Sequence, residues 1–169
     1  MEGHDRSERL KAFIPNMEDV VADYLAFFTL IVPNYPNLLK FLFGESMGDA
    51  LCLLIECTKP KSFNGAILIA SMCKISDKER LRWPIPKVLM FVPKFASSLA
   101  IVPTTDLAAV MNLMRYARKP RVGTMMELLQ AMDYLSSQLS NVNIPFIVLH
   151  GNVDVVTDPE VADDCFTIK

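Results

Sequence analysis

The hydrophobic positions of the chain first indicate a helix over Asn16–Val32, which reads NMEDVVADYLAFFTLIV. Its apolar residues recur at helical spacing and predict a wide buried face. They are Val20, Val21, Tyr24, Leu25, Phe27, Phe28 and Ile31. Asn16 is the predicted N-cap, because an asparagine oxygen can accept from a free N–H of the first turn. Glu18 and Asp19 then lie favourably at the positive end of the helix dipole.

Three short apolar runs predict buried strands: Leu38–Phe43, Gly65–Ala70 and Pro145–His150. The first of them is the pattern of a strand buried on both faces. Asp49–Cys57 predicts a helix between the first two strands, and a further helix is expected from Pro159, since proline suits the first helical turn. Strands that alternate with helices predict an α/β fold with a largely parallel sheet.

The chain changes character between the second and third strands. Ile75–Arg82 is charged, Trp83–Val102 contains several prolines, and Asp106–Leu139 is predicted to be helical with a break near Pro120. This pattern predicts helices inserted between two core strands. Methionine is dense here, at Met111, Met114, Met125, Met126 and Met132. These flexible side chains would either line a surface that binds apolar ligands or fill the hydrophobic core in the ordinary way.

Composition narrows the function classes. Hydrophobic residues make up 51% of the 169 residues, mean hydropathy is +0.28, and the net charge is -2. A globular domain is therefore expected, and without a basic block no nucleic-acid partner is predicted. The apolar runs are interrupted before the roughly 20 residues that span a bilayer. The charged opening MEGHDRSERLK is not followed by the apolar segment of a signal peptide.

The cysteines and histidines do not show metal-ligand spacing. Cys52, Cys57, Cys73 and Cys165 form no CxxC pair, and three of them lie in apolar runs. They are predicted to be buried free thiols in a reducing compartment. No metal site and no cofactor are predicted.

Residues 44–48 read GESMG and place Ser46 between Gly44 and Gly48. Such a G-x-S-x-G motif would occur by chance in roughly one chain in twenty of this length, so its context decides its meaning. A nucleophile elbow requires a strand before the motif and a helix after it, and both are predicted here. Its neighbouring positions must be small, because the helix doubles back against the strand. Ser46 is therefore the candidate nucleophile.

A catalytic triad also needs an acid and then a histidine further along the chain. Asp154 is the candidate acid, because it follows the third predicted strand, although it could equally be a turn aspartate. Asp158 precedes Pro159 and is better explained as a helix cap. The only histidines are His4 and His150, and neither follows Asp154. His150 ends an apolar strand, which favours a structural role, so His4 is the one candidate substitute base.

Several motifs together resemble the plant monoacylglycerol lipase and caffeoylshikimate esterase group of α/β-hydrolases. FLFGESMG, GAILIASMCKIS, KPRVGTMMELL and IPFIVLHGNVDVVTDP occur in the order of that group. The opening EGHDRSERLKAFIPNMEDVVAD also resembles its GHG-x-S segment and the helix after it. The likeness covers nearly the whole chain.

The resemblance implies a partial α/β-hydrolase fold in three parts. Residues 1–75 would form a core with the elbow, 76–140 a helical cap, and 141–169 a return to the core. Ser46 matches the nucleophile, Asp154 the triad acid, and the backbone N–H of Met47 an oxyanion donor. The implied substrates are acyl esters, namely monoacylglycerols, lysophospholipids or hydroxycinnamoyl esters. The cytoplasm is the expected location, with peripheral association with membranes.

The chain also departs from the pattern of the group. The triad histidine beyond the acid and the HG-x-G oxyanion loop have no counterpart here, which leads to the expectation of truncation at both ends. Asp5 replaces a glycine of GHG-x-S, and Asp49 replaces the last glycine of GESMGG. The alternative is an inactive family member that at most binds lipid or a partner. A third reading is an unrelated α/β binding domain in which GESMG is a chance match.

Overall fold

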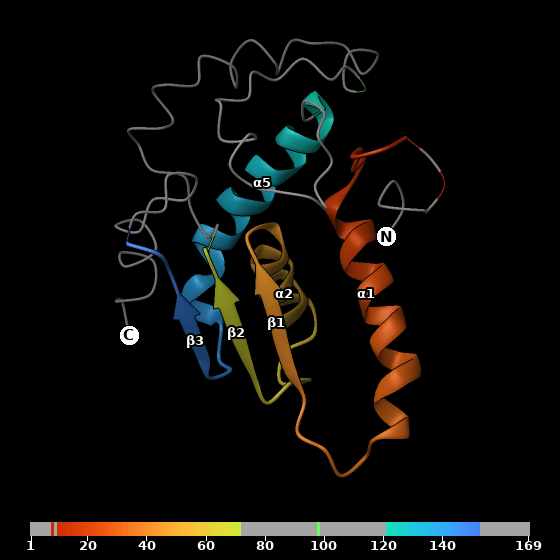
Figure 1. Cartoon of the computed structure of the whole chain (residues 1–169), viewed down its shortest axis with the longest axis vertical. Coiled ribbons are helices and arrows are strands. Elements are labelled where there is room, and N and C mark those ends of the chain that lie inside the picture. The colour runs from red at the N-terminus through yellow and green to blue at the C-terminus, as the bar shows by residue number, and fades with distance from the viewer. Residues whose placement is uncertain (1–7, 9, 72–97, 99–120, 153–169) are drawn as a thin grey trace.

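The computed structural model describes residues 8, 10–71, 98 and 121–152, and it contains helices and a sheet (Figure 1). The elements in chain order are α1 (Met17–Ile31), the 3-10 turn η1 (Val32–Asn34), β1 (Phe41–Glu45), α2 (Met47–Thr58), β2 (Gly65–Ile69), α5 (Val122–Gln138), the 3-10 turn η4 (Leu139–Asn141) and β3 (Phe146–Leu149). The predicted helix from Pro159 lies outside the described residues.

The strands form a parallel sheet in the order β1-β2-β3. Glu45 pairs with Ile69, and Ile69 pairs with Leu149, so the carboxyl ends of the strands meet at one edge of the sheet. The three strand predictions and the predicted parallel α/β arrangement are confirmed. Ser46, Ala70 and His150 each follow directly on one of these strand ends.

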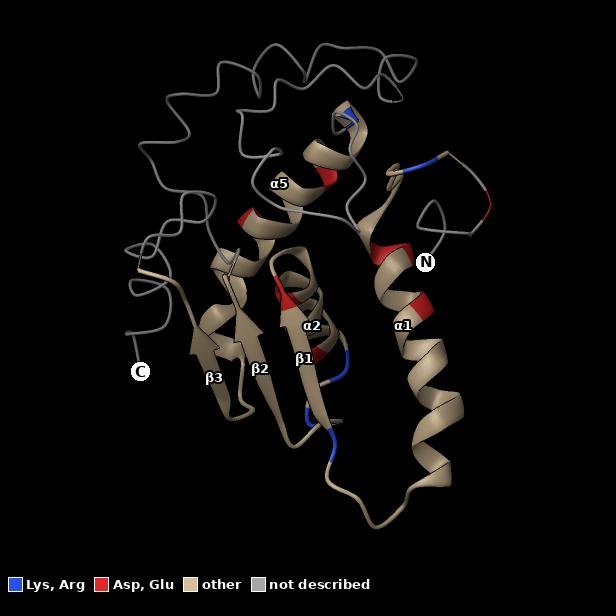
Figure 2. Ribbon diagram, in the orientation of Figure 1, with Lys and Arg blue, Asp and Glu red and all other residues tan. Residues whose placement is uncertain are grey.

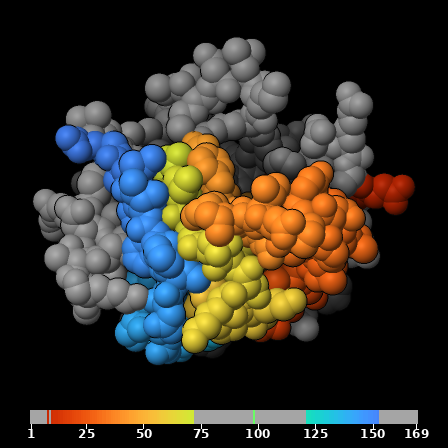
Figure 3. Space-filling model, turned by 90° about the horizontal axis from the view of Figure 1, so that it is seen from below, coloured from red at the N-terminus to blue at the C-terminus, as the bar shows by residue number. Residues whose placement is uncertain are grey.

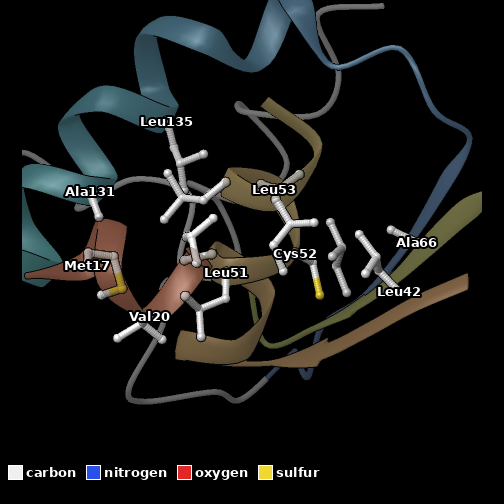
Figure 4. Packing of buried hydrophobic residues seen from close by; sticks show 14 of the residues in the cluster. Met17, Val20, Leu42, Leu51, Cys52, Leu53, Ala66, Ala131 and Leu135 are labelled. Atoms are coloured by element: carbon white, nitrogen blue, oxygen red, sulfur yellow. The ribbon is translucent and has the colours of Figure 1, made fainter. Parts of the chain in front are cut away.

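Helix α2 is the centre of the core. All residues from Asp49 to Glu56 are buried, and α2 packs against β1 and β2 on one side and against α1 and α5 on the other. In Figure 4, Cys52 lies toward Leu42 and Ala66 of the sheet, while Leu51 lies nearer Val20 of α1. Full burial of a leucine-sized side chain stabilises a fold by about 1.5–3 kcal/mol, so this helix anchors the other elements.

The beginning of α1 is fixed by local and by distant contacts. The Asn16 side chain accepts a hydrogen bond of 2.7 Å from the Glu18 N–H, which confirms the predicted N-cap. The Met17 N–H donates to Glu127 Oε2 on α5 at 3.0 Å, and the Ile14 N–H donates to Thr124 Oγ1 at 2.9 Å. Helix α5 therefore holds the start of α1, although about 110 residues separate them in the sequence.

Two predictions about burial are wrong. The wide buried face of α1 is reduced to Met17, Val20 and Val21, while Phe27 is 55% exposed. The first strand is not buried on both faces, because Phe43 is 66% exposed. The physical reason is that α2 is the described helix that packs on the strands, on one face only, while α1 buries only residues of its first turns (Figure 1).

The open face of the sheet carries large apolar side chains. They are Phe41, Phe43, Ile147 and Leu149, and Leu38 and Leu39 just before β1 are also exposed. Figure 3 shows the molecule from the end where the strands begin, with α1, the segment after α2 and β3 side by side. Contiguous exposed apolar surface favours association with other apolar surfaces. None of the described helices is both long and apolar enough to cross a membrane.

Phe43→Ser should therefore lower self-association and the fluorescence of a dye that binds apolar surface. The side chain is exposed, so its loss should cost little folding free energy. The matched control is its neighbour Leu42→Ser, because Leu42 is 3% exposed. That change should destabilise the fold by about 2–5 kcal/mol and raise the dye signal. Equal dye binding by Phe43→Ser and the parent chain would contradict the exposure of this face of the sheet.

Candidate active site

Ser46 lies in a strained turn between β1 and α2. Its backbone has φ 55 and ψ -117, a region that costs a residue other than glycine about 1–3 kcal/mol. The Ser46 N–H donates to the Ile69 carbonyl at 2.9 Å, which ties the turn to β2. The Ser46 carbonyl accepts from the Asp49 N–H at 3.1 Å, which starts the helix. The structure thus confirms the strand, turn and helix predicted around this serine.

Gly44 makes this turn sterically possible. A Cβ atom on Gly44 would lie 2.4 Å from the Gly48 carbonyl oxygen and 2.5 Å from the Asp49 nitrogen. Both contacts are with backbone atoms, which cannot rotate away. Gly48 differs, because a Cβ there would meet no atom within 4 Å. The prediction that the neighbouring positions must be small therefore holds at Gly44 and is wrong at Gly48.

The start of α2 creates a positive electrostatic environment beside Ser46. Met47 is the first residue of this helix, and N–H groups of a first turn have no acceptor within the helix. The aligned peptide dipoles add partial positive charge at the same end. Asp49 is fully buried in the first turn, where that charge is favourable to a carboxylate.

The other predicted site residues are only partly placed. His150 directly follows β3, at the same sheet edge as Ser46, and is half-buried. Asp154 and His4 lie outside the described residues, so their roles stay predictions. The residues from 72 to 97 and from 99 to 120 are not described either, and the predicted cap over 76–140 stays a prediction.

Ser71 is a polar residue at this edge that the sequence analysis did not single out. It is 4% exposed, and its Oγ has no hydrogen-bond partner among the described residues. Its position just after β2 was the available signal, because residues after parallel strands gather at one edge. No three His, Cys, Asp or Glu side chains in the described ranges are grouped as a metal would require.

The parallel sheet and the strained serine turn are the arrangement of an α/β-hydrolase core. Comparisons with known proteins agree. The profile of the family described as "Serine aminopeptidase, S33" matches residues 1–167. The chain belongs to this family of serine hydrolases, whose members among its relatives include lipases and esterases.

Curated relatives give the same class. The chain is 33% identical over 174 residues to caffeoylshikimate esterase of Arabidopsis thaliana. The match covers 93% of this chain and 52% of the relative. It is 25% identical over 173 residues to monoglyceride lipase of Mus musculus, covering 95% of this chain and 56% of the relative. The chain thus spans about half the length of these relatives.

Solved structures share the fold. A monoacylglycerol lipase of Paleococcus ferrophilus superposes with a TM-score of 0.67 at 18% identity, covering 99% of this chain and 66% of that one. A metagenome-derived lipolytic enzyme also gives a TM-score of 0.67, at 20% identity, covering 90% of this chain and 58% of its own. The expected partial α/β-hydrolase fold is confirmed.

Gly44→Ala should lower the free energy of unfolding by about 1–3 kcal/mol, because the new methyl group meets backbone atoms of α2. Gly48→Ala is the matched control, since the space beside Gly48 is open. Alanine there should raise the stability by about 0.5–1 kcal/mol, because it loses less backbone freedom than glycine. Urea unfolding of both variants measures the difference. Equal effects at the two glycines would contradict the close approach at Gly44.

Cys52 should resist alkylation across the ordinary pH range. Burial and the nearby Asp49 charge raise the pKa of Cys52 from 9.0 to about 12, which leaves about a thousandfold less thiolate than an ordinary cysteine. Burial and Glu56 also raise the pKa of the half-buried Cys57. Iodoacetamide followed by peptide mass mapping should show Cys57 modified before Cys52.

The raised pKa of Cys52 also predicts how the stability of the fold depends on pH. A thiol whose folded pKa is raised stays neutral while the unfolded thiol ionises, so its stabilising effect is present below pH 9.0 and is lost as the pH rises toward about 12. Cys52→Ala should flatten this alkaline decline in unfolding free energy. A variant with the same decline as the parent chain would exclude Cys52 as its source.

Proposed function

We propose that the chain carries out carboxylic ester hydrolysis of the monoacylglycerol lipase and caffeoylshikimate esterase type, with Ser46 as nucleophile. The observation that carries the proposal is the φ of 55 at Ser46, at the junction of β1 and α2. A residue other than glycine persists in such a conformation only where its surroundings enforce it, and such strain gathers at functional sites. The backbone hydrogen bonds that join Ser46 to Ile69 and Asp49 supply that enforcement, and the missing side chain at Gly44 leaves room for the turn.

In the proposed reaction, Ser46 Oγ attacks the carbonyl carbon of an acyl ester as a base takes the hydroxyl proton. The developing oxyanion is stabilised by the Met47 N–H at the positive end of α2. The alcohol then leaves with that proton, and water hydrolyses the acyl-serine. We propose that Asp154 is the acid that orients the histidine base, as in a Ser-Asp-His triad.

The relatives support acyl esters as the substrate class. Their names specify a caffeoylshikimate ester for one and monoglycerides for the other. We therefore propose monoacylglycerols, lysophospholipids or hydroxycinnamoyl esters as substrates of this chain.

The second candidate is a catalytically inactive family member that binds lipid or a partner. It is favoured by Asp49, a fully buried carboxylate three residues after Ser46, where the motif of the related group has a glycine. Loss of the histidine of a serine triad lowers the rate by about 10⁶, and loss of one oxyanion donor by about 10²–10³. A family member that lacks either group should therefore turn over slowly.

Peripheral association with membranes is part of the proposal. Leu38 and Leu39 are exposed and directly precede Lys40, which combines apolar side chains with a positive charge, as interfacial segments do. The proposed location is the cytoplasm, since the described cysteines Cys52 and Cys57 are free thiols.

A fluorophosphonate probe tests the proposal, because it labels a serine that is activated as a nucleophile. The parent chain should be labelled, and Ser46→Ala should lose the label. Ser137→Ala, which changes an exposed serine on α5, is the matched control and should keep it.

His4→Ala separates the two candidate functions further. Loss of labelling in this variant would identify His4 as the base, and retained labelling would direct the search to His150. Absence of label from the folded parent chain would overturn the hydrolase proposal and support the inactive family member.

A further inference from the structure

A groove lies on the outer side of the helical layer, away from the sheet. Helices α1 and α5 form its walls, and Leu54 and Thr58 of α2 line its floor. Its volume is about 720 Å³, within the range of small-molecule sites. None of its lining residues belongs to the serine turn.

The groove exists because the helices approach each other through small side chains. Ala22 on α1 and Ala131 on α5 line it, and neither reaches far across the gap. Met17 and Ala131 are both buried at the inner part of this junction, as Figure 4 shows. The hydrogen bond from the Met17 N–H to Glu127 Oε2 pins the two walls together at one end. Core packing and this hydrogen bond therefore fix the positions of the two walls.

The walls combine an apolar surface with negative charge. Val21 and Leu25 give α1 an apolar stripe along the groove. The charged residues of the two helices are all acidic, namely Glu18, Asp19 and Asp23 on α1 and Glu127 and Asp133 on α5. Figure 2 shows these positions in red on both helices. Glu18 and Glu127 line the groove itself, and among the described residues no Lys, Arg or His lines it.

Tyr134 completes the polar rim. It lines the groove from α5 and is half-exposed. An aromatic face of this kind attracts an ammonium group through its ring quadrupole. An occupant with a cationic head would thus meet two carboxylates and an aromatic ring, while an anionic head would be repelled.

We propose that this groove binds an amphiphilic cation, an ammonium head carrying one alkyl chain. The stripe from Met17 to Leu25 extends about 12 Å at 1.5 Å per helical residue, which suits a medium-length chain. The same length offers only about two turns of contact to a helical peptide, much less than a stable protein interface requires. This ligand class goes beyond the ester hydrolysis proposed above, and its site uses other residues.

Binding of decyltrimethylammonium below its micelle concentration tests the assignment. Methyl NMR of the full chain should show shifts at Val21, Leu25 and Ala131 in the groove. Decyl sulfate, with the same alkyl chain and opposite charge, should leave these methyl groups unchanged. Shifts confined to Ile147 and Leu149 would place the probe on the open sheet face and overturn the proposal.

Two pairs of variants separate the groove from general effects on α1. Ala22→Trp should fill the groove and abolish binding, while Ala26→Trp changes an exposed alanine of the same helix outside the groove and should not. Glu18→Gln should weaken binding by about two- to fivefold, the range of a partly exposed ion pair. Asp19→Asn, an exposed neighbour that does not line the groove, should weaken it less.

Far-UV circular dichroism confirms that each variant is folded before binding is compared. Equal affinity of the ammonium and sulfate probes, or equal loss in Ala22→Trp and Ala26→Trp, would overturn the proposal. Tighter binding of a basic amphipathic peptide than of the ammonium probe, competing at the same methyl groups, would replace the small cation by a protein partner and also overturn it.

Discussion

The structure depends on the close approach of β1 to the first turn of α2. Gly44 lies so near the Gly48 carbonyl and the Asp49 nitrogen that no side chain fits between them. This approach turns the chain sharply out of the sheet and leaves Ser46 with a positive φ. It also directs α2 back across the sheet, where its buried side chains form the centre of the core. One steric constraint thus sets both the serine and the packing.

From α2 outward, the molecule has two different surfaces. The other described helices pack on the outer side of α2, and their junction leaves the acidic groove. The opposite face of the sheet carries exposed phenylalanine and aliphatic side chains. Ser46 lies at the carboxyl edge of the sheet, where residues after the three parallel strands gather. The chain spans about half the length of the matched curated relatives.

Local signals in the sequence predicted the elements well. The Asn16 cap, the three apolar strands and the G-x-S-x-G turn each depend on residues close in sequence, and the structure confirms them. The burial of Phe27 and Phe43 was predicted wrongly, because an apolar pattern does not tell which element covers it.

The groove was not predicted, since its walls bring together Ala22 and Ala131, which lie more than 100 residues apart in the sequence. Ser71 was missed although its position just after the second predicted strand was a signal, because the sequence does not show that its side chain is buried. The assignments of Asp154 and of the cap concern residues outside the described ranges and remain predictions.

The backbone hydrogen bonds of Ser46 to Ile69 and Asp49, together with the close approach at Gly44, hold Ser46 in a strained conformation. The most direct measurement is the backbone φ of Ser46 in solution, from NMR residual dipolar couplings and the intraresidue HN–Hα contact. The account predicts a positive φ near 55. A negative φ, in the helical or extended region, would show that the turn is relaxed and would contradict both the strained turn and the role that depends on it.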